Sequence, residues 1–148
     1  MMAYPPAATL GAWGNDDIVL YHGTLAQHVS NILRQVSLAY ARPFKDFGPG
    51  FYTTTIQRQA EAWAWQLSAQ TPGATAAVVS FQVKRDQLAS LDALWFVRGA
   101  ADADDFWRFI FHCRSGMPDH GRSVTGGVRQ KWYDIVVGPV AGFWRQRV

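Results

Sequence analysis

A histidine at the end of an apolar run is the first residue whose type points to chemistry. His22 follows Ile18-Val19-Leu20-Tyr21, a run typical of a buried strand, and Gly23 and Thr24 come next. A buried imidazole needs hydrogen-bond partners, and a glycine lets another backbone or a flat ligand approach closely. The alternative is a core histidine bonded to a carbonyl, which we would favour for a histidine taken alone.

A second segment adds aromatic side chains. Gly50 precedes Phe51 and Tyr52 in Asp46-Phe-Gly-Pro-Gly-Phe-Tyr-Thr-Thr54. Adjacent residues on a strand point to opposite faces, so Phe51 and Tyr52 cannot both fill one core. One of them is expected to line a second surface, such as a ligand site. The alternative is a sheet that is buried on both faces.

A tryptophan on the following helix is the third candidate. Trp63 falls eleven residues after Tyr52, and alanines at 60, 62 and 64 would let this helix pack closely against its neighbours. The alternative is that Trp63 and Trp65 belong to the core, and we predict this for Trp65.

Taken together, these segments resemble a known family. Tyr-His-Gly-Thr, the 46–54 segment, Gln-Ala-x-x-Trp-Ala and the 133–141 segment are similar to a bacterial family of uncharacterised domains, which is placed with the ADP-ribosyltransferase-like folds. The similarity spans residues 20 to 141.

The resemblance implies an NAD site. It assigns a ribose of NAD to His22, the nicotinamide amide to the backbone of Gly23, and the two faces of the nicotinamide ring to Tyr52 and Trp63. The predicted NAD-binding residues are completed by Thr24, Gly50 and Phe51. Nicotinamide in NAD is a flat cationic ring, so two aromatic faces would stabilise it by stacking and cation–π attraction.

The catalytic carboxylate is harder to assign. Cleavage of the nicotinamide–ribose bond gives an oxocarbenium-like ribose, which a nearby carboxylate stabilises. Most members of the superfamily use a glutamate on a late strand, whereas the single glutamate here, Glu61, lies just before Trp63. The last strand offers Asp134 and Gln130 instead, and we take Asp134 with His22 and Tyr52 as the predicted catalytic set. The alternative role of Asp134 is a turn or edge aspartate bonded to backbone amides.

The elements that must position these residues are short. The pattern predicts strands at 18–21, 51–55, 76–83 and 93–97, and one long strand or a strand pair over 128–137. It predicts helices over 24–33, where Thr24 is the N-cap, over 57–69 and over 102–114. This order favours an α+β fold with a mostly antiparallel, split sheet. The resemblance specifies an ADP-ribosyltransferase-like split antiparallel β-sandwich with flanking helices.

Length and composition indicate one globular domain. The chain has 148 residues, 49% of them hydrophobic, with seven tryptophans. We predict a flexible N-terminal arm over residues 1–17, rich in Pro, Ala and Gly, and a single domain over 18–148.

Several classes of protein are disfavoured. No apolar run approaches the ~20 residues of a membrane span, and no signal peptide is recognisable, so we expect no membrane partner and a cytoplasmic location. Cys113 is alone, and His112 and His120 lack the spacing of paired metal ligands, so we expect no disulfide within the chain and no metal. The net charge is +3, but the arginines are scattered and form no dense basic patch.

The expected function is that of an enzyme, an NAD-dependent mono-ADP-ribosyltransferase, with NAD as substrate and a protein or nucleic acid as acceptor. The resemblance implies the toxin of a bacterial toxin–antitoxin or defence module, with an antitoxin protein as a further partner. The alternatives are an NAD glycohydrolase and a catalytically inactive module that acts by binding protein. An RNA 2′-phosphotransferase is disfavoured because residues 1–17 are too short and uncharged for its basic N-terminal domain.

Overall fold

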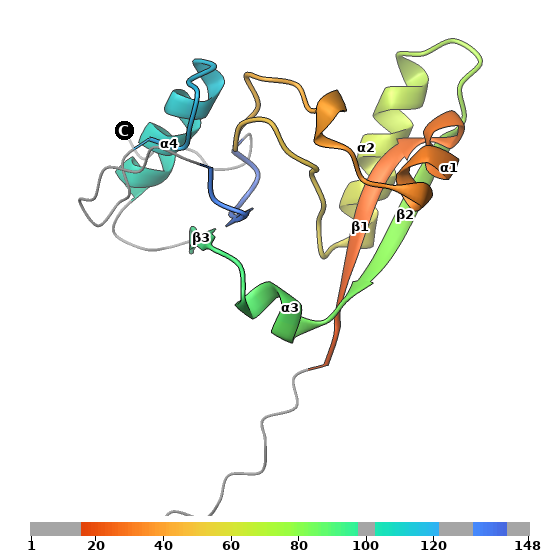
Figure 1. The fold of residues 1–148 in the computed structure, drawn as a ribbon. Coiled ribbons are helices and arrows are strands. Elements are labelled where there is room, and N and C mark those ends of the chain that lie inside the picture. The colour runs from red at the N-terminus through yellow and green to blue at the C-terminus, as the bar shows by residue number, and fades with distance from the viewer. Residues whose placement is uncertain (1–15, 98–102, 122–131, 142–148) are drawn as a thin grey trace, which may run out of the picture.

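The computed structural model describes residues 16–97, 103–121 and 132–141. In chain order, its elements are β1 (Ile18–Leu25), α1 (Ala26–Arg34), the 3₁₀ helix η1 (Leu38–Tyr40), α2 (Gln57–Ala69), β2 (Ala76–Val83), α3 (Arg85–Ala89), β3 (Ala93–Trp95), α4 (Ala103–Arg114) and β4 (Ile135–Val137) (Figure 1).

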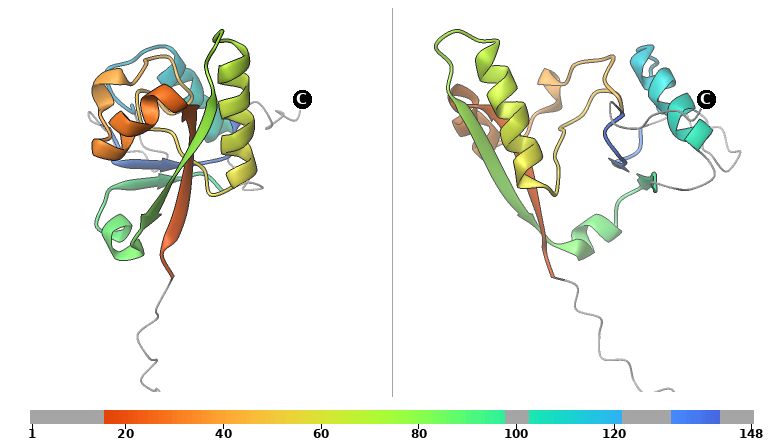
Figure 2. Two further views of the ribbon diagram at one scale, coloured as in Figure 1. Left: turned by 90° about the vertical axis from the view of Figure 1, so that its right-hand side faces the viewer. Right: turned by 180° about the vertical axis from the view of Figure 1, so that it is seen from behind.

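The first sheet is an antiparallel pair of long strands. β1 and β2 pair along their whole length, from Ile18 opposite Val83 to Leu25 opposite Ala76. Figure 2 shows α2 along one side of this pair and α1 on the other. Ala60 and Ala64 are the buried residues of α2, so small side chains bring that helix close to β1.

The second sheet is a parallel pair of short strands with a core of its own. β3 and β4 pair from Ala93 opposite Ile135 to Trp95 opposite Val137. Beside them, buried side chains of α4 form a cluster with Ala141, against which Phe47, Phe96 and Trp107 are packed; its α4 members are Phe106 and Ile110. The chain between η1 and α2 runs between the two sheets (Figure 1).

The prediction for the first half of the chain is confirmed in part. Helix 57–69 and strand 76–83 form with the predicted bounds. Thr24 was predicted to cap α1, and this is wrong: β1 continues through Thr24, which is buried, and the N-cap residue is Leu25. The reason is tertiary, because β2 offers partners up to Ala76 and extends the ladder.

The predicted strand at 51–55 is also wrong. Only Thr54 forms a bridge, an isolated antiparallel one with Tyr21, in which each backbone N–H donates to the other residue's carbonyl. The carbonyl of Tyr52, which a longer ladder would direct at β1, lies 2.7 Å from the His22 ring instead. The His22 side chain therefore takes the place of the next backbone hydrogen bond between this segment and β1.

The later elements are shorter than predicted. The strand at 93–97 ends at Trp95, and of the segment 128–137 only Ile135–Val137 is a strand, while 128–131 lie outside the described residues. Helix α3 was not predicted. The helix predicted over 102–114 forms as Ala103–Arg114, with position 102 outside the described residues.

The fold class is mixed α/β, with one small antiparallel and one small parallel sheet in the described parts. The parallel pair departs from the mostly antiparallel expectation. Of the predicted N-terminal arm, residues 1–15 lie outside the described residues, while Asp17 accepts a hydrogen bond from Gln82 of β2 at 2.9 Å. Within the described ranges, no helix has the length and apolar character needed to span a membrane.

Candidate functional site

His22 lies on β1, and one of its two ring nitrogens is hydrogen-bonded. Its Nδ1 is 2.7 Å from the carbonyl oxygen of Tyr52. Because a carbonyl only accepts, Nδ1 must carry the hydrogen, and in the neutral imidazole Nε2 is then an acceptor. No hydrogen bond to Nε2 occurs within the described ranges. His22 therefore offers a lone pair that suits a hydroxyl donor.

Phe51 fixes the plane of that ring. The two rings stack with centroids 4.2 Å apart, and Phe81 of β2 meets Phe51 edge-on at 5.7 Å. Phe51 thus packs on the same face of the sheet as His22, and its ring covers one face of the imidazole.

Gly23 is required by the close approach of α2. A Cβ at this position would lie 2.1 Å from the carbonyl oxygen of Ala60 and 3.0 Å from the nitrogen of Ala64. Both are backbone atoms, so no side-chain rotation could make room. Since adjacent residues alternate between faces, His22 points away from α2.

The backbone polar groups of Gly23 point to the edge of β1 that β2 does not cover. Tyr21 exchanges hydrogen bonds with Thr54 on that edge, and in a strand the N–H and C=O of every second residue share a side. The bridge at Thr54 is isolated, so the Tyr52 backbone does not pair with Gly23. Gly23 is buried, and within the described ranges its N–H and C=O have no hydrogen-bond partner on that edge, which leaves an unfilled position for another strand or a ligand amide.

Tyr52 is held by its hydroxyl group. Its Oη accepts from the N–H of Phe47 at 2.9 Å and donates to the carbonyl of Gly48 at 2.7 Å. Burial is the main cause that raises the pKa of Tyr52 to about 12, so the phenol is neutral at physiological pH. The side of the residue that can meet a ligand is its ring, since Tyr52 is 39% exposed.

Trp63 lies on the side of α2 that faces the same segment. Gln59, one turn earlier, accepts a hydrogen bond from the Thr54 hydroxyl at 2.6 Å, and residues four apart share one side of a helix. Trp63 is 48% exposed and flanks the Ala60 and Ala64 face that covers Gly23.

Trp65 does not belong to the core, so that prediction is wrong. It is 70% exposed, because α2 buries only its two alanines and Trp65 lies away from their face.

Thr24 is buried within β1. At Gly50 a Cβ would meet only the Tyr52 ring, at 3.7 Å, so no close approach demands glycine there.

Asp134 immediately precedes β4, at the end of the second sheet. Its Oδ2 accepts from the backbone N–H of Asp92 at 2.9 Å, and its own N–H donates to the carbonyl of Asp92 at 2.9 Å. This matches the alternative interpretation, an edge aspartate bonded to a backbone amide. Glu61 accepts a hydrogen bond from Gln57 on the same helix at 2.8 Å.

The described contacts join His22 to the Phe51 ring and to the backbone of Tyr52, beside Gly23 on β1, while Trp63 lies on α2, the helix that covers Gly23. They leave Asp134 with Asp92. Across the described residues, no three His, Cys, Asp or Glu side chains are arranged to hold a metal ion.

Sequence reasoning missed the residues that anchor Tyr52. Phe47 and Gly48 do so through their backbone, and backbone bonds leave no signature in side-chain type. The one signal in the sequence was the glycine at position 48 itself, because the φ of +77° that it adopts is a conformation that favours glycine.

Comparison with known proteins places the chain in a family without a defined activity. No curated protein matches the chain, and no solved structure does. The sequence model of DUF3990, a family described as proteins of unknown function, matches residues 18–143. The predicted resemblance to a family of uncharacterised domains is confirmed, and the link to ADP-ribosyltransferases stays a prediction. Because the match covers most of its length, the chain belongs to the DUF3990 family.

Proposed function

We propose that this protein binds NAD at the uncovered edge of β1 and transfers ADP-ribose from it to an acceptor. One observation carries the proposal. His22 offers a lone pair in its neutral form and Gly23 an unfilled backbone position among the described residues, while the partly exposed Tyr52 and Trp63 lie on the segment and the helix next to that edge. An ADP-ribosyltransferase-like arrangement of the two sheets is part of the same proposal.

The groups on this edge match those of nicotinamide riboside. A carboxamide has one acceptor and two donor hydrogens, so it can pair with the N–H and C=O of Gly23 as a strand would. A ribose hydroxyl can donate to Nε2 of His22. The rings of Tyr52 and Trp63 can flank the cationic nicotinamide, where each contact is worth about 0.5–2 kcal/mol.

The proposed reaction exchanges one bond at the ribose. The bond between nicotinamide and C1′ breaks, and nicotinamide leaves as a neutral molecule with the electron pair. A nucleophile of the acceptor forms the new bond at C1′ and loses its proton to solvent or a base. A protein or nucleic-acid acceptor makes the protein a transferase, whereas water makes it a glycohydrolase.

The positive charge that develops on the ribose requires a counter-charge. Asp134 stays our proposed carboxylate. Its Oδ2 already bonds to Asp92, so Oδ1 is the atom that would face the substrate. The variant Asp134→Asn keeps the bond to Asp92 but removes the charge. We therefore expect it to lower the rate of nicotinamide release without loss of stability.

Nicotinamide release from NAD tests the proposal. We expect His22→Ala to lower the rate roughly tenfold or more, since a hydrogen bond to the substrate is lost. Tyr52→Ala and Trp63→Ala should each lower it roughly fivefold, equivalent to about 1 kcal/mol. Matched controls are His28→Ala and Trp65→Ala, which remove a histidine and a tryptophan exposed elsewhere on α1 and α2. Wild-type rates in both His22→Ala and Tyr52→Ala would refute this site.

A second function has one observation in its favour. Asp134 and Glu61 both accept hydrogen bonds within the protein, and neither is gathered with His22 by the described contacts. This favours a module that has the same fold but no catalytic activity and that acts by binding protein. Calorimetry separates the two: absence of NAD and ADP-ribose binding at millimolar ligand supports the module.

A further inference from the structure

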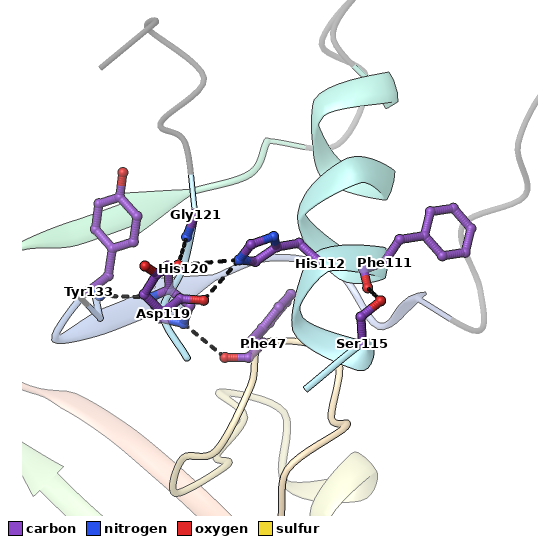
Figure 3. A network of polar contacts seen from close by, with 8 residues as sticks. All are labelled: Phe47, Phe111, His112, Ser115, Asp119, His120, Gly121 and Tyr133. Atoms are coloured by element: carbon purple, nitrogen blue, oxygen red, sulfur yellow. Dashed lines mark hydrogen bonds and ion pairs between the residues drawn. The ribbon is translucent and has the colours of Figure 1, made fainter. Parts of the chain in front are cut away.

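The loop that anchors Tyr52 is itself anchored from the other half of the protein. His120, only 4% exposed, lies between Phe47 and Tyr133 (Figure 3). Its Nε2 is 3.0 Å from the carbonyl oxygen of Phe47, and its Nδ1 accepts from the N–H of Tyr133 at 2.7 Å.

These two partners determine the state of the ring. A backbone N–H can only donate, so Nδ1 must present its lone pair to Tyr133. A carbonyl can only accept, so Nε2 must carry the hydrogen that points to Phe47. His120 is therefore the neutral Nε2–H tautomer, and a proton on Nδ1 would set two N–H groups against each other.

The backbone N–H and C=O of Phe47 connect His120 to Tyr52. The Phe47 carbonyl accepts from His120, while its N–H donates at 2.9 Å to the Tyr52 hydroxyl, which in turn donates to Gly48 at 2.7 Å. The imidazole and the phenol are separated by a single residue with hydrogen bonds at both ends. Arg114 of α4 also holds this loop, through Asp46 at 2.6 Å.

We propose that His120 is a positioning residue of the NAD site, which orients the Tyr52 ring by fixing the Phe47 backbone. The inference rests on the proposed function for its ligand, but the link between His120 and Tyr52 does not depend on it. It extends the site from the edge of β1 to the segment that follows α4.

The surroundings of His120 keep it in the neutral form that this role needs. Burial is the main cause that lowers its pKa, and His112 lowers it further, while the Phe47 carbonyl and Asp119 oppose this. The ring also packs against Trp132, edge-on at 4.4 Å. A buried imidazole needs hydrogen-bond partners in any role, but the partner of Nε2 here is the residue whose N–H also holds the Tyr52 hydroxyl.

Two conservative variants separate positioning from packing. His120→Gln keeps a donor at the distance of Nε2 and can still bond to Phe47. His120→Asn keeps an acceptor near Nδ1 for Tyr133, but it is one atom too short to reach Phe47. His28→Gln is the matched control, since His28 is exposed on α1 and, among the described residues, hydrogen-bonds to its neighbour Gln27.

Two readouts are measured on each full-length variant. The first is the NMR signal of the ¹³Cζ-labelled Tyr52 phenol, together with hydrogen exchange of the Phe47 amide. The second is the affinity for NAD by calorimetry. We expect His120→Asn to shift the Tyr52 signal, to speed Phe47 exchange and to weaken NAD roughly tenfold. His120→Gln should stay within about threefold of wild type in affinity, and His28→Gln should match wild type.

A measurement on the unmodified protein covers the case in which both variants fail to fold. Acid titration followed by imidazole ¹⁵N shifts should show Tyr52 changing at the same pH as His120, and independent titration of the two would overturn the inference. NAD binding by wild type with unchanged Tyr52 signals and affinity in His120→Asn would also overturn it. Absence of NAD binding with a shifted Tyr52 signal would refute the proposed function and leave the link from His120 to Tyr52 supported.

Discussion

The contact between Gly23 and α2 makes the sharpest prediction about stability. In Gly23→Ala the new methyl carbon would lie 2.1 Å from the carbonyl oxygen of Ala60, against an ordinary separation of about 3.3–3.6 Å. The helix must therefore move by roughly 1 Å or more, away from a strand against which it buries Ala60 and Ala64. Overpacking of this kind costs about 1–3 kcal/mol, a large share of the ~5–15 kcal/mol that stabilises a typical domain.

Urea unfolding followed by tryptophan fluorescence and far-UV circular dichroism measures this cost. The matched control is Gly50→Ala, because a Cβ there meets only the Tyr52 ring at an ordinary 3.7 Å. We expect the control to stay within about 0.5 kcal/mol of wild type.

A second-site variant identifies the atom responsible. The clash involves the backbone oxygen of Ala60, so Ala60→Gly removes only a methyl group and should not rescue Gly23→Ala. The two costs should instead add. The reasoning is refuted if Gly23→Ala unfolds within about 0.5 kcal/mol of wild type, or if Ala60→Gly restores its stability.

Three further predictions concern the side chains of Tyr52, His120 and Cys113. Tyr52→Phe leaves the Phe47 N–H and the Gly48 carbonyl without their partner, so urea unfolding should show a loss of about 1–2 kcal/mol. Because the ring is kept but loses the bonds that hold it, NAD affinity should weaken roughly tenfold, as for His120→Asn. His120 has a folded-state pKa below its ordinary 6.5, so the unfolded state binds more protons; stability should be complete above pH 6.5 and fall as the pH drops from there towards the folded value. Unfolding curves between pH 5 and 8 should show a shallower slope for His120→Gln, and an unchanged slope would contradict this. Burial raises the pKa of Cys113 to about 12, so Ellman's reagent at pH 8 should react only after unfolding, and rapid reaction of the native protein would show that the thiol is accessible.

Two elements could be predicted with their bounds because their signals are local. Gln57–Ala69 is rich in good helix formers and ends before a Pro-Gly turn, whose Gly73 has a φ of +75°. Ala76–Val83 carries β-branched and aromatic residues and pairs fully with β1. In both cases local preference and tertiary packing agree.

The prediction failed where long-range partners outweighed local preference. Phe51–Thr55 has the composition of a strand, but the Tyr52 carbonyl accepts a hydrogen bond from the His22 ring. The pairing with β1 is therefore limited to the bridge at Thr54. The parallel pairing of β3 with β4 joins segments about forty residues apart, with helix α4 between them in the chain. No periodicity within either short strand could indicate that partner.

For the candidate site, the sequence by itself determined the residue types and their order: an imidazole before a glycine, an aromatic pair, and a tryptophan on the next helix. It could also indicate that Gly23 permits a close approach. Only the tertiary structure decided which nitrogen of His22 holds the hydrogen, where the Tyr52 hydroxyl is bound, and that Asp134 bonds to Asp92 at the end of the second sheet. The physical reason is that each of these depends on backbone groups from distant segments, and backbone groups are the same in every sequence.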